Sequence, residues 1–135
     1  MKQSALLGMA IALAAGTMLP VAMPRSSRAA APQEEEVSFR QDVLHIFQRR
    51  CVPCHEKGGT GYKESGLLLM TYADVMKGTK YGPMVIPRDP DESNLMRVID
   101  WRASPKINMP HKKKQLSTFE RDTIRTWIRQ GAKDN

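Results

Sequence analysis

Cys51, Cys54 and His55 are the residues of this sequence whose types and spacing most directly predict chemistry. Two thiols three positions apart, followed at once by an imidazole, give the spacing by which a c-type haem is attached. The sulfur atoms add across the two vinyl groups of the porphyrin, and the histidine lies under the iron as its proximal ligand. The motif therefore predicts one covalently bound haem c.

The same two cysteines would also suit a disulfide, a thioredoxin-like redox pair or half of a zinc site. A structural zinc site needs four ligands, and the other two histidines, His45 and His111, stand alone in the sequence. A thioredoxin-like pair belongs to a βαβ pattern, which the flanking residues do not supply. Haem attachment is therefore favoured over these alternatives.

Met109 is the residue that we expect on the opposite side of the iron. Of the nine methionines, four lie in the N-terminal apolar region and four others lie in apolar patterns that suit core packing. Met109 instead lies in a polar loop, directly before Pro110, and this loop can fold back over the haem face opposite His55. A soft thioether in this position raises the reduction potential of the iron. His111 is the competing candidate for the same role.

Four short helices are expected to position these residues, and they predict an all-α domain. Between them, Glu56–Gly66 contains four glycines and is expected to be a loop that turns tightly or approaches another group closely. Leu67–Met70 is expected to be buried against the porphyrin. The first helix is expected to begin at Ser38, which forms a capping box with Gln41, and to run to about Arg50. The second is expected from Thr71 to Gly78, and the third from Asp89–Glu92 to near Trp101. The last is expected to begin at Ser117, which forms a capping box with Glu120, and to end at Gly131.

The last of these helices has the clearest apolar face. Phe119, Thr123, Ile124, Trp127 and Ile128 follow each other at helical spacing. We expect this face to cross the first helix and pack on its phenylalanines. Four short helices alone give a thin core, so a haem is expected to contribute much of the buried apolar surface.

The N-terminal region has the pattern of a secretory signal peptide. Lys2 precedes an apolar run from Ala5 to Leu19, and small residues near Ala30 suit cleavage. The run is shorter than the roughly 20 apolar residues that a spanning helix needs, although an uncleaved anchor is the alternative. We therefore expect residues 1–29 to be a signal peptide for export to the periplasm, 30–37 a flexible tail and 38–135 the folded domain. A membrane would be a partner only if the segment stayed uncleaved.

The net charge of the exported chain limits which partners we expect it to bind. Without Lys2, Arg25 and Arg28, 18 basic residues stand against 14 acidic ones, a net charge of +4. This excess is too small to predict nucleic-acid binding. Lys112–Lys114 follow Met109 and are expected either to form a positive rim that steers an acidic redox partner or only to be solvated. A monomer is expected.

Several segments together resemble the planctomycete-type cytochrome c domain, a variant of the single-haem class I cytochromes c. The resemblance implies covalent haem c on Cys51 and Cys54, His55 as proximal ligand and Met109 as distal ligand. The sequence departs from the family pattern at His45, where proline is frequent, and at Lys112–Lys114, where glycine or proline is frequent. The segments are Phe39 to His55, Gly66 to Gly78, Gly82-Pro83 with Pro87 to Pro90, Met109-Pro110, Leu116-Ser117 and Trp127 to Ala132.

The expected fold is therefore a cytochrome c-like bundle around a covalent haem, and the expected function is electron transfer. An iron with both axial positions filled by protein has no open site for a substrate, so it transfers electrons through its outer sphere. One alternative is a haem subunit of a larger respiratory complex. The other is a five-coordinate iron with peroxidase or gas-binding activity, for which Arg102 and His111 would be the nearby polar groups.

Overall fold

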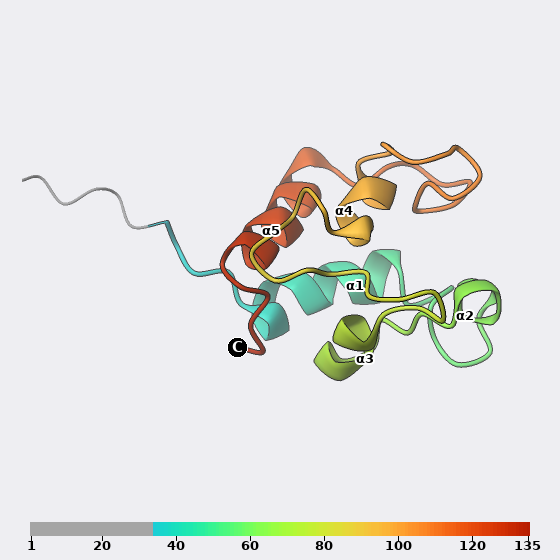
Figure 1. Cartoon of the computed structure of the whole chain (residues 1–135), viewed down its shortest axis with the longest axis horizontal. Helices are drawn as coiled ribbons and strands as arrows, with labels where there is room; N and C mark the ends of the chain where they lie inside the picture. The colour runs from blue at the N-terminus through green and yellow to red at the C-terminus, as the bar shows by residue number, and fades with distance from the viewer. Residues whose placement is uncertain (1–33) are drawn as a thin grey trace, which may run out of the picture. The chain divides into compact units, whose positions relative to one another are not determined.

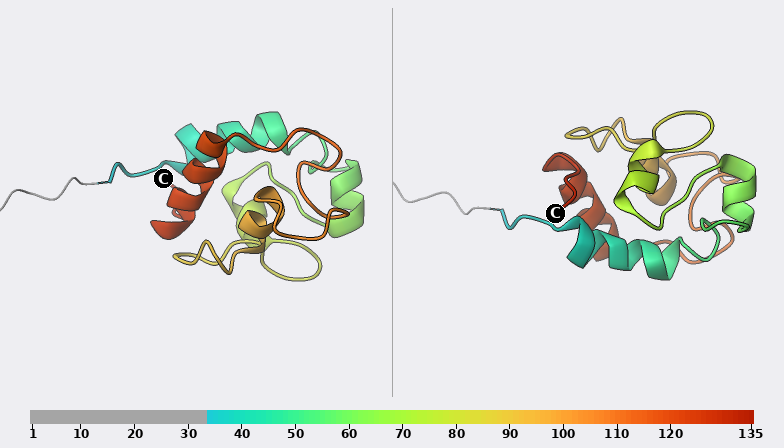
Figure 2. Two further views of the ribbon diagram at one scale, coloured as in Figure 1. Left: turned by 90° about the horizontal axis from the view of Figure 1, so that it is seen from above. Right: turned by 90° about the horizontal axis from the view of Figure 1, so that it is seen from below.

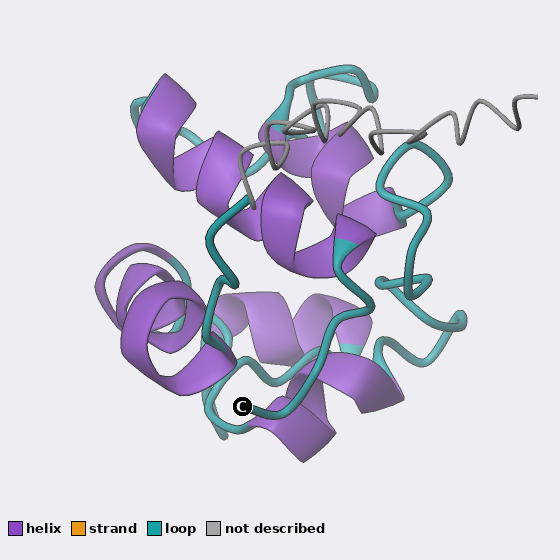
Figure 3. Ribbon diagram, turned by 90° about the vertical axis from the view of Figure 1, so that its left-hand side faces the viewer, coloured by secondary structure: helices purple, strands orange, loops and turns teal. Residues whose placement is uncertain are grey.

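The computed structural model describes residues 34–135. The expected signal peptide and its cleavage site lie outside the described residues. The described part is helical and forms no β-strand (Figures 1 and 3), so the predicted all-α class is confirmed. A π-helical turn and five α-helices follow each other as η1 (Phe39–Val43), α1 (Leu44–Arg50), α2 (Thr60–Ser65), α3 (Tyr72–Lys77), α4 (Asn94–Ile99) and α5 (Thr118–Arg129).

The first helix begins at Ser38, as predicted, but with a different reciprocal contact. The Ser38 hydroxyl accepts a hydrogen bond from the backbone N–H of Gln41. The backbone N–H of Ser38 donates to Asp42 Oδ2 at 2.8 Å, so Asp42 takes the role expected of the Gln41 side chain. The backbone N–H of Val43 reaches back five residues to the Ser38 carbonyl, which makes the first turn π-helical before α1 begins.

The predicted crossing of the first and last helices is confirmed. Figure 1 shows α5 lying across the start of this first helix, and the rings of Phe39 and Trp127 are 5.4 Å apart. The indole N–H of Trp127 donates to the Lys133 carbonyl at 2.9 Å, which ties the C-terminal segment to α5. The capping box of Ser117 and Glu120 is present as predicted.

Phe119 does not belong to the buried face of α5, because its side chain is 78% exposed. It lies in the first turn of the helix, ahead of the part that packs on η1. Ile124, Trp127 and Ile128, farther along, are buried as expected.

Two boundaries differ from the sequence prediction. The glycine-rich segment expected to be a loop contains α2, which ends where Gly66 takes a left-handed conformation with φ of 73°. Helix α4 begins at Asn94 rather than near Asp89, because the Asp89 carboxylate closes a turn on the Glu92 N–H instead. The buried Ser93 hydroxyl donates to the Asp89 carbonyl at 2.7 Å within this turn, and it accepts from the Ile86 N–H at 2.9 Å, which joins the turn to the preceding segment.

The apolar segment Leu67–Met70 is buried only in part. Leu67 and Leu69 are 5% and 3% exposed, whereas Met70 is 46% exposed, so the burial expected of the whole run holds for its leucines and not for its methionine. Within residues 34–135, none of the helices has the length and apolar character needed to cross a membrane.

Candidate functional site

Cys51, Cys54 and His55 lie in the turn that directly follows α1. The backbone N–H groups of Cys54 and His55 both donate to the Cys51 carbonyl at 3.0 Å, so the motif forms one compact turn. Both cysteines are half-buried, and their thiols are free rather than joined in a disulfide. Two thiols are thus available within one turn for thioether bonds.

The environment of Cys51 differs from that of a redox-active thiol. Burial raises the pKa of the Cys51 thiol to about 12, with Arg50 opposing the rise and with Glu120 and Cys54 adding to it. Reactive cysteines of disulfide exchange have lowered pKa values, because the thiolate is the nucleophile. The shift of Cys51 therefore has the opposite sign from the one that a thioredoxin-like pair requires.

The imidazole of His55 is held in one orientation. The residue is only 8% exposed, and its Nδ1 lies 3.2 Å from the Leu67 carbonyl oxygen. Because a carbonyl can only accept, Nδ1 carries the proton, and Nε2 of the neutral ring keeps its lone pair. Burial lowers the pKa of His55, partly offset by this hydrogen bond, so the neutral ring is favoured. Metal-binding histidines in proteins are commonly fixed by such a second contact.

Glycine at position 61 lets the chain pass close to the Nε2 end of this ring. A Cβ atom on Gly61 would lie 2.7 Å from both Cε1 and Nε2 of His55, closer than real Cβ contacts allow. A Cβ on Gly59 would lie 2.4 Å from the Cys54 carbonyl oxygen. The glycine-rich segment thus packs closely on the cysteine–histidine turn, as predicted. The two free thiols and the oriented imidazole of that turn fit a haem bound through His55.

Met109 lies in the loop between α4 and α5, and both of its backbone groups are hydrogen-bonded. Its N–H donates to the Val98 carbonyl at 2.9 Å, and its own carbonyl accepts from the indole N–H of Trp101 at 2.9 Å. The half-buried Met109 packs against the hydrophobic core. The neighbouring Asn108 Oδ1 is buried without a hydrogen-bond partner within residues 34–135.

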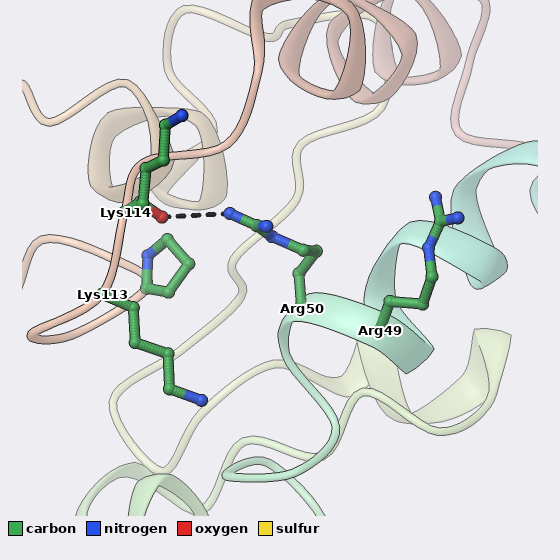
Figure 4. A pocket seen from close by; sticks show the side chains of 5 residues that line it. Arg49, Arg50, Lys113 and Lys114 are labelled. Atoms are coloured by element: carbon green, nitrogen blue, oxygen red, sulfur yellow. Dashed lines mark hydrogen bonds between the residues drawn. The ribbon is translucent and has the colours of Figure 1, made fainter.

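Arg50 links the segment of the cysteine–histidine turn to the segment of Met109. Its Nη2 donates to the carbonyl of Lys114 at 3.0 Å and to that of Gln115 at 3.3 Å. Figure 4 shows the first of these bonds, and both views of Figure 2 place the loop after α4 beside the end of α1. Arg50 therefore connects the residue just before the cysteine–histidine turn directly to the loop that follows Met109.

The other polar candidates are exposed or already paired with another residue. His111 and His45 are exposed, and so are Lys112, Lys113 and Lys114. Arg102 is paired with the Asp100 carboxylate at 3.5 Å.

Trp101 and Arg50 make contacts that the sequence did not predict. Trp101 was expected only as the approximate end of a helix, and Arg50 only as the last residue before the motif. No local pattern predicts either contact, because each joins residues eight or more positions apart.

Comparison with known proteins gives one match. Residues 51–112 match the sequence model of a family described as Planctomycete cytochrome C. No curated protein and no solved structure matches the chain. The matched stretch begins at Cys51 and includes Met109, and it agrees with the resemblance stated from the sequence.

Proposed function

We propose that this chain, whose residues 51–112 match the family described as Planctomycete cytochrome C, is a small electron carrier outside the cytoplasmic membrane. One haem c would be bound covalently by Cys51 and Cys54, with His55 and Met109 as the axial ligands. When bound, this group supplies a one-electron couple between ferrous and ferric iron.

The observation that carries the proposal is the state of His55. A buried, neutral imidazole whose Nδ1–H donates to the Leu67 carbonyl offers Nε2 to a metal without first losing a proton. The ring follows two free thiols in the same turn. The Leu67 carbonyl fixes the orientation of the ring, and Gly61 adds no side chain against Nε2.

Met109 supports the second axial position. It is half-buried on the core, and both of its backbone groups are tied to the end of α4. A thioether held in this way would close the iron to water and to substrates, which favours electron transfer over catalysis.

An oxidised and a reduced spectrum with a redox titration test the proposal. The oxidised protein should show the weak absorption band near the red end that methionine ligation gives, and Met109→Ala should abolish it. His111→Ala should leave the band intact. Rapid binding of carbon monoxide by the reduced parent protein would replace this proposal with the five-coordinate alternative.

The place of the protein in the cell is tested separately. We propose that residues 1–29 direct export and are removed, so the N-terminal residue of the native protein should lie near Ala30. The native protein should elute from gel filtration as a monomer. Elution at a much larger size would indicate a subunit of a respiratory complex.

We also propose that acidic redox partners dock beside the loop that carries Met109. Four basic side chains line one pocket there with Pro110: Arg49 and Arg50 from the end of α1, and Lys113 and Lys114 from the facing loop (Figure 4). Only Arg50 has an acidic neighbour in the described ion pairs, Glu120 at 3.8 Å. Such an excess of positive charge attracts acidic surfaces and weakens with salt.

Small redox reagents of opposite charge test this surface without knowledge of the natural partner. Lys113→Gln with Lys114→Gln should slow electron transfer with hexacyanoferrate and should flatten its dependence on ionic strength. Transfer with a cationic cobalt complex should become faster. The matched control, Lys63→Gln with Lys77→Gln, removes the same charge from exposed positions in α2 and α3. Equal effects of the two double variants would show that only net charge matters.

A further inference from the structure

Trp101 has an unusual backbone conformation at the end of α4. Its φ is 60°, in the left-handed region that glycine adopts easily and that bulky residues rarely adopt. The N–H of Arg102 donates to the Arg97 carbonyl, and the N–H of Trp101 reaches the Val98 carbonyl, which is the hydrogen-bond pattern of a Schellman helix end. Tryptophan thus occupies the position where glycine is usual, and a strained residue of this kind points to a function.

The indole of Trp101 has a specific partner. Its Nε1–H donates to the Met109 carbonyl at 2.9 Å, although the side chain is 44% exposed. The left-handed conformation of Trp101 therefore goes together with a contact to a residue eight positions later. Glycine would relieve the strain but would leave the Met109 carbonyl without this donor.

Met109 is held at two points on the same helix end. The Val98 carbonyl accepts from the Met109 N–H at 2.9 Å, and the Trp101 indole donates to its carbonyl. Other backbone hydrogen bonds of this loop close turns within it, such as that from the Ile107 N–H to Ser104. These two bonds are what fix the backbone of Met109 to α4.

We propose that Trp101 is a positioning residue that keeps Met109 in place as the distal ligand, an inference that rests on the proposed function. For an external ligand to reach the iron, the Met109 side chain must move away. A hydrogen bond that exists only in the closed arrangement lowers the population of the open one. The apparent affinity of any external ligand is reduced by the same factor.

Imidazole binding to the oxidised, haem-loaded protein measures this population. Trp101→Phe keeps an aromatic ring and removes the N–H donor. It should raise the affinity for imidazole up to about fivefold, the change expected when one neutral hydrogen bond is lost. Trp101→Gly removes the ring together with the backbone strain, and it should raise the affinity in the same direction. Because glycine suits the left-handed position, this second variant should fold even if Trp101→Phe does not.

The Met109→Ala background separates positioning from a general structural effect. There the iron is already open, so Trp101→Phe should leave the affinity for imidazole unchanged. An equal rise in both backgrounds would overturn the inference, because it would show that Trp101 acts on the pocket rather than on Met109.

Two further results distinguish the inference from the proposed function. If both Trp101 variants bind imidazole as the parent does while Met109→Ala loses the red absorption band, Met109 is the ligand and Trp101 does not position it. If Met109→Ala keeps the band and the parental affinity, the proposed ligation fails, and the inference fails with it.

Discussion

The Nδ1 atom of His55 lies 3.2 Å from the carbonyl oxygen of Leu67, and this contact joins the proposed proximal ligand to the segment that follows α2. It fixes both the orientation of the imidazole and the nitrogen that carries the proton. Burial lowers the pKa of His55 from its ordinary value of 6.5, despite the opposing effect of this hydrogen bond. The folded chain therefore favours the neutral ring.

This pKa shift predicts how stability depends on pH. Below about 6.5 the unfolded chain binds a proton at His55 that the folded chain does not, so the free energy of unfolding should fall as the pH drops, and it should level off below the lowered pKa. One such group contributes at most about 1.4 kcal/mol per pH unit. Denaturant unfolding of the haem-free chain, in which no iron occupies Nε2 of His55, measures the slope between pH 7 and pH 4.

The other two histidines provide the control for this slope. His45 and His111 are both exposed, so the double variant His45→Gln with His111→Gln should keep the pH dependence of the parent protein. If the dependence disappears in that variant, it comes from the exposed histidines and not from His55.

Gly61→Ala should disturb the imidazole directly. The new Cβ atom would lie 2.7 Å from Cε1 and Nε2 of His55, so the ring or α2 must shift. We expect a loss of about 1–3 kcal/mol in the free energy of unfolding, together with an altered absorption spectrum of the bound haem. Gly58→Ala is the control. Its φ of 87° is strained for alanine, but its new Cβ atom would contact nothing within 4 Å. That variant should lose stability and keep the parental spectrum.

The parts of this structure that the sequence predicted well depend on short stretches of chain. The end of the first helix at Arg50, the helix start at Thr71 and the capping box of Ser117 and Glu120 each need only a few neighbouring residues. Their hydrogen bonds form wherever the local backbone allows them, so residue types and spacing are sufficient.

The features that the sequence did not predict depend on the tertiary structure or lack an apolar pattern. Helix α2 buries none of its residues, so no hydrophobic period marks it. Its end is fixed from outside, where the Lys80 N–H donates to the Ser65 carbonyl. The contact of Trp101 with Met109 likewise depends on a left-handed backbone that tryptophan does not favour, and only the folded loop supplies its partner.

Asp100 should be the most sensitive acidic residue of the fold. Its side chain is 12% exposed, it accepts from Arg125, and Arg121 and Arg102 each lie 3.5 Å away. Asp100→Asn leaves three guanidinium groups around an uncharged amide, and we expect the free energy of unfolding to fall by about 2 kcal/mol. Chemical denaturation measures the loss.

Asp91→Asn is the matched control for Asp100, since it removes the same charge near the same arginine. Asp91 is 80% exposed and contacts only Arg125, at 3.5 Å, within the described ion pairs. Its loss should change stability by less than about 0.5 kcal/mol. Equal effects of the two variants would contradict a special role for the arginine cluster around Asp100.

Arg50→Gln should loosen the loop that carries Met109. The substitution shortens the side chain and removes the charged donor that reaches the carbonyls of Lys114 and Gln115. We expect a loss of about 1 kcal/mol in stability, because the lost hydrogen bonds have a charged donor but the side chain is 31% exposed. Amide hydrogen exchange within residues 110–115 should become faster, because local opening then costs less free energy.

Arg49→Gln tests whether this effect belongs to the contact or to the charge. Arg49 is the neighbouring residue on α1 and lines the same pocket, but no hydrogen bond joins its side chain to the loop in the described structure. Both variants lower the net charge equally, so both should weaken the attraction of anionic reagents. Only Arg50→Gln should accelerate exchange in the loop. If Arg49→Gln accelerates it as much, the Arg50 hydrogen bonds are not what holds the Met109 segment in place.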